Sequence, residues 1–153
     1  MRIYLGLGTN LGDKELNLRV AVQKIEERIG KVISLSAFYA TAPWGFQSDN
    51  NFLNAAAGVE TSLSHFDILE RTQRIEQAIG RLHKSHDGVY SDRLIDIDLL
   101  LYGDKILQDE RLSLPHPLMA ERKFVLEPLA EIAPDVVHPV LHKTIRELFL
   151  VLS

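Results

Sequence analysis

The sequence has no cysteine, no long apolar run and no excess of positive charge. Without cysteine the chain can form neither disulfides nor thiolate sites, which is compatible with a cytoplasmic location. No apolar stretch approaches the roughly 18 residues that a membrane helix needs, so we expect no membrane partner. The net charge of −4 gives no support to nucleic-acid binding. A phosphate ligand would have to be met by local basic residues or by a metal.

The composition is that of an ordinary globular protein. Hydrophobic residues make up 46% of the chain and charged residues 25%, which are common values for a folded domain. A length of 153 residues is long enough for a sizeable core and is typical of one domain. We therefore expect residues 1–153 to form a single domain.

Hydrophobic periodicity predicts an α+β fold. We expect two helices and four strands, namely helices at 14–29 and 65–82 and strands at 2–8, 32–40, 52–61 and 93–102. Their order, βαββαβ, is the ferredoxin-like arrangement, an antiparallel sheet with both helices on one face. A C-terminal extension should contain a hairpin over 105–114, a segment near 118–132 and a last helix at 143–152, and Pro128, Pro134 and Pro139 should keep its middle irregular.

Local signals support both predicted helices. Asp13 and Ser64 stand where an N-cap is expected, because their side-chain oxygens can accept the first unpaired N–H groups of a helix. Gly30 is a plausible left-handed stop for the first helix. The glycines of the segment GLGTNLGD match neither the dinucleotide fingerprint nor the P-loop, so a tight strand-to-helix turn is the favoured interpretation.

The segment Arg93–Tyr102 is the most informative stretch of the chain. On a strand, Asp96 and Asp98 point to one face, while Ile95, Ile97 and Leu99 point to the other. Like charges side by side repel each other, and a cation between them removes that cost. Two carboxylates on one face are suited to Mg²⁺. The alternative is an edge strand with a solvated polar face, and the apolar run after Asp98 weighs against it.

Several cations could hold a phosphate near this pair. Arg93 precedes Asp96 by three residues, His116 lies between two prolines, and Arg122 follows soon after. Guanidinium groups bind phosphoryl oxygens in a bidentate manner and stay charged at any working pH. Together with a metal, these groups could stabilise a phosphoryl-type transition state. His116 taken alone is better explained as a structural or ion-pairing residue.

Other functions share a carboxylate pair. A nucleotidyltransferase, a glycosyltransferase or a calcium site could use the same two residues. A non-catalytic RNA-binding or ligand-sensing module could use the same element order, but RNA binders of this shape display aromatic residues on the central strands and a basic surface. Here the central strand carries aspartates and the net charge is negative.

Several motifs in the right order resemble the 6-hydroxymethyl-7,8-dihydropterin pyrophosphokinase family, which is ferredoxin-like. They are GLGTNLGD, FYATAPWG, FLNAAAGVETS, TQRIE, DRLIDIDLLLYG and LPHPLMAERKFVLEPLAEIAP. The resemblance implies transfer of pyrophosphate from ATP to the hydroxymethyl oxygen of the pterin, with release of AMP, in folate biosynthesis. It also implies a monomer that takes small-molecule substrates.

The resemblance assigns roles to individual residues. Two Mg²⁺ ions would be held by Asp96 and Asp98. The implied catalytic residues are Arg93, Asp96, Asp98, His116 and Arg122. The implied ATP-binding residues are Gln73, Glu76, Arg93, Leu99, Arg111, Ser113, His116 and Arg122. The implied pterin-binding residues are Thr41, Trp44, Phe52, Asn54, Asp96 and Phe124, with Phe52 and Phe124 stacking on the ring. The loops at 41–51 and 83–92 would be lids.

Overall fold

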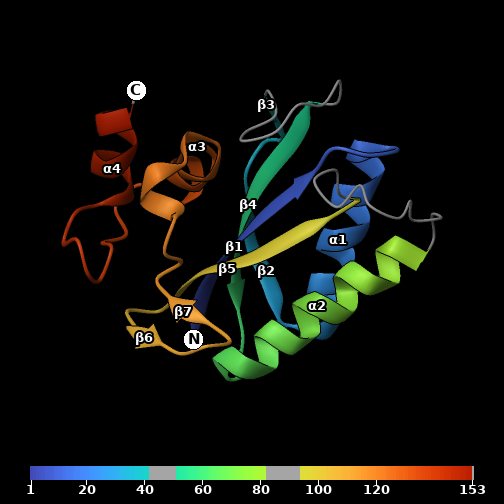
Figure 1. Cartoon of the computed structure of the whole chain (residues 1–153), viewed down its shortest axis with the longest axis horizontal. Coiled ribbons are helices and arrows are strands. Elements are labelled where there is room, and N and C mark those ends of the chain that lie inside the picture. Colours follow the sequence, from blue (N-terminus) through green and yellow to red (C-terminus); the bar gives the residue numbers. More distant parts are fainter. Residues whose placement is uncertain (42–50, 82–93, 153) are drawn as a thin grey trace.

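The computed structural model describes residues 1–41, 51–81 and 94–152 (Figure 1). Its elements, in chain order, are β1 Arg2–Thr9, α1 Lys14–Arg28, β2 Lys31–Leu35, β3 Tyr39–Thr41, β4 Phe52–Glu60, α2 His65–Arg81, β5 Asp96–Tyr102, β6 Leu107–Gln108, β7 Ser113–Leu114, the short 3-10 helix η1 Met119–Glu121, α3 Lys123–Ile132 and α4 Ile145–Leu152. Within these ranges no helix combines the length and the apolar character that crossing a bilayer requires.

The main sheet is antiparallel and has the strand order β2-β4-β1-β5, with β3 also paired to β4. The inward-facing residues of β1, β4 and β5 pack against α1 and α2 on one face, where Ile3, Leu5, Leu18, Ile25 and Ile75 are fully buried. The predicted ferredoxin-like α+β arrangement is therefore confirmed. The expected N-caps are confirmed as well, because Leu16 N–H donates to Asp13 Oδ1 and Asp67 N–H donates to Ser64 Oγ.

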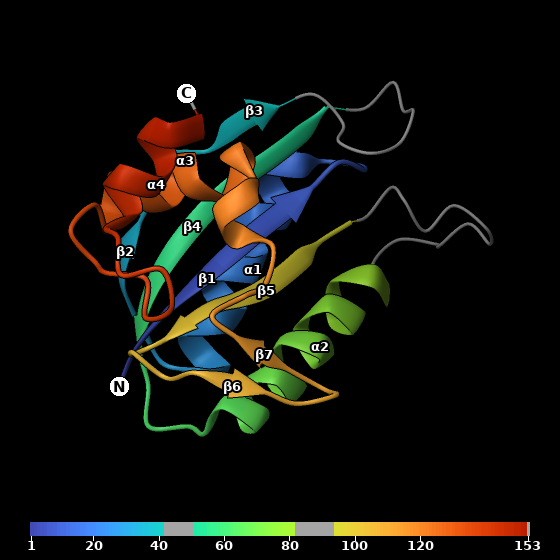
Figure 2. The same ribbon diagram turned by 60° about the vertical axis from the view of Figure 1, so that its left-hand side comes forward.

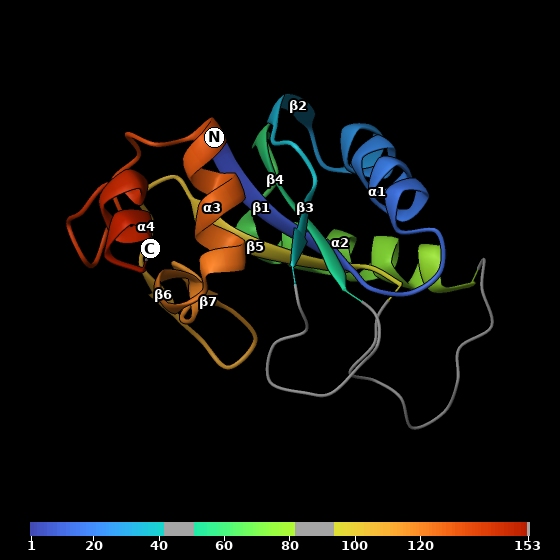
Figure 3. The same ribbon diagram turned by 90° about the horizontal axis from the view of Figure 1, so that it is seen from above.

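The C-terminal extension covers the opposite face of the sheet (Figure 1). Met119, Leu126 and Leu129 pack with Tyr4 and Leu101 in a second core, and Figure 3 shows α3 and α4 lying together on this side. The prediction that Pro128, Pro134 and Pro139 keep the middle of this extension irregular is wrong at Pro128, which lies inside α3. Proline in a helix interior costs about 3 kcal/mol. Burial of the leucines beside it offsets that cost.

Two further expectations are corrected. The single strand predicted at 32–40 is divided into β2 and β3, because the chain breaks at Ser36, whose hydroxyl accepts from Ala56 N–H at 2.9 Å. Gly30 does not have a left-handed backbone. A glycine is needed there because a Cβ would lie 2.1 Å from the Glu60 carbonyl oxygen, where β4 passes.

Strand β5 contains an irregularity that changes which face its side chains occupy. Leu5 pairs with Leu99 and Tyr4 with Leu101, so Leu100 has no partner opposite it on β1. Ile97 and Leu99 belong to the core under α1 and α2, whereas Leu100 and Leu101 both belong to the core under α3 and α4. This β-bulge lets one strand begin with a polar outer face and end buried on that same side.

Candidate active site

The carboxylate pair lies at the start of β5, on the face opposite α1 and α2. Ile97 and Leu99 are buried in the core on the other face, as the alternation predicts. Asp96 and Asp98 are half-buried and stand opposite Gly8 and Gly6 of β1. Among the described residues, no group of three or more His, Asp or Glu side chains forms a metal site.

Glu76 of α2 closes the free edge of β5 beside this pair. Strand β5 is the last strand of the sheet, and the Ile97 N–H donates to Glu76 Oε2 at 2.8 Å. The pKa of Glu76 is raised to about 7, chiefly by burial and also by the nearby Asp96 and Asp98, while the Ile97 N–H opposes this shift. Glu76 thus lies beside the carboxylate pair. Gln73 lies one turn earlier and is exposed.

His116 is brought to the same place by its backbone. Its N–H donates to the Leu100 carbonyl at 3.0 Å, at the bulge of β5. Its Nδ1 accepts the Leu118 N–H at 3.3 Å, so the neutral ring carries its proton on Nε2. Burial and the neighbouring Arg122 guanidinium lower the pKa of His116, while Asp96 acts in the opposite direction.

Arg122 and Phe124 stand where η1 passes into α3. Arg122 is the N-cap residue of α3, and its guanidinium carbon lies 5.7 Å from the centroid of the Phe124 ring. Both side chains are half-buried. Because Arg122 and Asp96 both influence His116 electrostatically, three of the predicted catalytic residues converge on one region.

The predicted pterin residues of the described part lie on the same face of the sheet. Phe52 and Asn54 are alternate residues of β4, and Asn54 Nδ2 donates to Thr41 Oγ1 at 2.7 Å. Helix α3, which begins beside Phe124, packs on β4. Gly8 lies opposite Asn54 and is a neighbour of the site for which no role was predicted. The alternation of glycines with apolar residues in β1 is the signal that could have found it.

The hairpin of β6 and β7 lies beside the first turn of α2 (Figure 2). The Arg111 guanidinium carbon lies 4.9 Å from the centroid of the Phe66 ring, and Ser113 is half-buried in β7. Strand β7 contacts β5, whose Leu99 is buried. Residues 42–50 and 82–93 lie outside the described residues, and with them Trp44, Arg93 and most of the two predicted lids.

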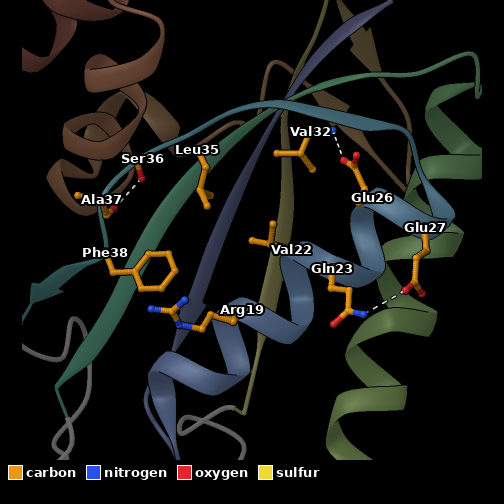
Figure 4. A pocket seen from close by; sticks show the side chains of 10 residues that line it. All are labelled: Arg19, Val22, Gln23, Glu26, Glu27, Val32, Leu35, Ser36, Ala37 and Phe38. Carbon is orange, nitrogen blue, oxygen red and sulfur yellow. Dashed lines mark hydrogen bonds between the residues drawn. The ribbon is translucent and has the colours of Figure 1, made fainter.

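A groove of about 860 Å³ lies elsewhere, between α1 and the segment from β2 to β3 (Figure 4). Val22, Val32 and Phe38 provide its apolar wall. None of the predicted site residues lines it. The Glu26 carboxylate of α1 accepts the Val32 N–H of the edge strand β2, and a charged group that covers a strand edge opposes pairing with other strands.

Comparison with known proteins agrees with the geometry. A family model described as 7,8-dihydro-6-hydroxymethylpterin-pyrophosphokinase (HPPK) matches residues 4–134. Enzymes named 2-amino-4-hydroxy-6-hydroxymethyldihydropteridine pyrophosphokinase are similar to this chain. The one from Porphyromonas gingivalis is 48% identical over 139 residues, which cover 90% of this chain and 93% of the relative. The one from Bacillus subtilis is 41% identical over 134 residues, which cover 87% and 78%.

The fold is shared with solved structures. A crystal structure of a Plasmodium falciparum HPPK-DHPS triple mutant superposes with a TM-score of 0.79 at 19% identity, over 99% of this chain and 43% of that one. This chain thus spans less than half of that longer protein. The match over residues 4–134 and the extent of the bacterial relatives lead to one conclusion. The chain belongs to the 7,8-dihydro-6-hydroxymethylpterin-pyrophosphokinase family.

Proposed function

We propose that this chain transfers the pyrophosphoryl group of ATP to the hydroxymethyl oxygen of 6-hydroxymethyl-7,8-dihydropterin and releases AMP, a step of folate biosynthesis. The observation that carries the proposal is the convergence of Asp96, Asp98, His116 and Arg122 at one end of β5, inside the span that the family model matches. An acidic pair beside basic groups suits a charged phosphoryl donor.

The carboxylate pair fits Mg²⁺ by the chemistry of its donors. Asp96 and Asp98 offer hard oxygen ligands on one strand face and are only half-buried, and Mg²⁺ is commonly held by one or two carboxylates together with phosphates. We infer that they hold two ions, which would neutralise the negative charge of the triphosphate and make its phosphorus atoms more electrophilic. Glu76 would support them by fixing the backbone between the two aspartates through Ile97 N–H.

The remaining residues position the reactants and stabilise charge. The pterin oxygen forms a bond to the β-phosphorus while the bond from that phosphorus to the α,β-bridging oxygen breaks, so AMP departs and the alcohol proton is released. Arg122 and the Nε2–H of His116 would donate to phosphoryl oxygens. Phe52 and Phe124 would stack on the pterin, with Asn54 and the backbone of Thr41 at its hydrogen-bonding edge. On the nucleotide side, Arg111, Ser113 and the β5 edge at Leu99 would contact ATP.

The test is a product assay with ATP, Mg²⁺ and the hydroxymethyl pterin. AMP should appear in step with pterin consumption, and excess EDTA should stop the reaction. Production of ADP would assign the chain to ordinary phosphoryl transfer. Release of pyrophosphate would assign it to nucleotidyl transfer. Either result would refute the proposed function.

A further inference from the structure

A row of residues crosses the sheet from β3 to β5 on the face that carries the carboxylate pair. Tyr39 pairs with Asn54, Asn54 with Gly8, and Gly8 with Asp96. Residues that stand directly opposite each other point to the same face. Two strand spacings separate Asn54 from Asp96, which is about 10 Å. Gly8 is the residue between the amide and the carboxylate, and it places no side chain there.

Two neighbours determine how the Asn54 amide is oriented. Its Nδ2 donates to Thr41 Oγ1 at 2.7 Å. Its Oδ1 lies 3.1 Å from the point that a Cβ on Gly8 would occupy, and the Phe52 ring comes within 3.9 Å of the same point. Asn54 is 4% exposed, so turning the amide away from its partner would leave a buried polar group unsatisfied.

We propose that Gly8 and the Thr41 hydroxyl are positioning residues for the pterin, an inference that rests on the proposed function. The Thr41 hydroxyl holds the Asn54 amide with its oxygen over Gly8. The bare strand at Gly8 keeps the space between Asn54 and Asp96 open. A flat heterocycle can then meet Asn54 at one edge while its hydroxymethyl group reaches the carboxylate end. Any side chain at position 8 would displace the amide, the aromatic ring of Phe52, or the substrate.

The first test compares two glycines of β1 that lie on one face. Gly8→Ala should raise KM for the pterin at least tenfold, which is 1.4 kcal/mol in binding free energy, and should change KM for ATP less than twofold. Gly6→Ala is the matched control, because its added Cβ would meet the Leu100 methyl group at 3.3 Å and has no atom of Asn54 among its nearest contacts. Its effect on KM for the pterin should stay below twofold.

The second test separates the hydroxyl of Thr41 from its shape. Thr41→Val keeps the shape of the side chain but loses the hydroxyl that accepts from Asn54 Nδ2, so KM for the pterin should rise about fivefold or more. Thr41→Ser keeps the hydroxyl and should restore KM to within twofold of the wild type. A purely structural role would raise KM for both substrates together and would not be rescued by serine.

The outcomes separate this inference from the proposed function. If the wild type releases AMP but Gly8→Ala and Thr41→Val leave KM for the pterin unchanged, the positioning role is wrong and the function stands. An equal rise in KM for ATP in these variants would also refute the positioning role. If the wild type consumes no pterin, the proposed function itself fails.

Discussion

Glu76 should make the metal-free protein less stable as the pH rises. Its carboxyl is buried beside Asp96 and Asp98, and its pKa is raised from 4.5 to about 7. Between these two values the native state holds a proton that the unfolded chain has released. The free energy of unfolding therefore falls as the pH rises through this window and levels off above pH 7. At 1.36 kcal/mol per pKa unit, the rise from 4.5 to about 7 corresponds to about 3 kcal/mol.

Replacing the carboxyl by an amide removes this dependence. In Glu76→Gln the side-chain oxygen can still accept the Ile97 N–H, which Glu76 accepts at 2.8 Å, but the group no longer ionises. The variant should match the wild type near pH 4.5, where the native wild-type carboxyl is protonated. At pH 8 it should be more stable than the wild type by about 3 kcal/mol.

The measurement is urea unfolding followed by far-ultraviolet circular dichroism at both pH values, with EDTA present. Glu70→Gln is the matched control on the same helix, because Glu70 is exposed and pairs with Arg74 one turn away. Its effect should stay within about 0.5 kcal/mol at either pH. A difference between Glu76→Gln and the wild type that does not change with pH would refute the reasoning, and so would a less stable Glu76→Gln at pH 8.

Three further predictions concern the site and its support. Asp98→Ala should lower kcat at least a hundredfold with an unchanged circular dichroism spectrum. The control Asp104→Ala, at an exposed position, should keep wild-type turnover. Near-normal activity of Asp98→Ala would exclude a catalytic role of the carboxylate pair. Phe124→Leu should raise KM for the pterin about tenfold, since stacking on a flat base contributes about 1–3 kcal/mol; an unchanged KM would exclude the stacking role. Leu126→Ala should lower the free energy of unfolding by about 2–5 kcal/mol in urea titrations. The control Leu150→Ala should lower it by about 0.5 kcal/mol or less, because Leu150 is 61% exposed. Equal effects of the two variants would contradict the contribution of the second core to stability.

Elements whose cause is local could be predicted from the sequence. The Asp13 cap depends on a bond three residues away, and the buried face of β5 depends only on alternation. The break between β2 and β3 could not be predicted in this way. Part of its cause is Glu131, whose carboxylate accepts the N–H of Ala37 from 94 residues further along the chain. The helix around Pro128 likewise depends on a sheet face that the local sequence does not reveal.

In the candidate site, too, features with a local cause could be predicted and features that depend on tertiary packing could not. The side of β5 on which Asp96 and Asp98 lie was predictable, because strand alternation determines it. The edge cap by Glu76 and the approach of His116 to Leu100 depend on how α2 and the segment after β7 pack. The alternation of glycines in β1 marks Gly8 as a position without a side chain, but only the strand register places Asn54 opposite it.

The bulge of β5 has a consequence for which sequence changes the family fold can accept. The run Leu99–Leu101 can exchange one apolar residue for another at modest cost, but a change in its length has a larger effect. Removing one leucine would remove the bulge and leave the other residues of β5 in their present pairing with β1, and the second core would lose one of its two β5 leucines. Adding a residue would shift the register by one, which reverses the side chains on one side of the insertion, so that Asp96 and Asp98 would turn into the core under α1 and α2. Insertions and deletions in this strand should therefore be far more harmful than substitutions.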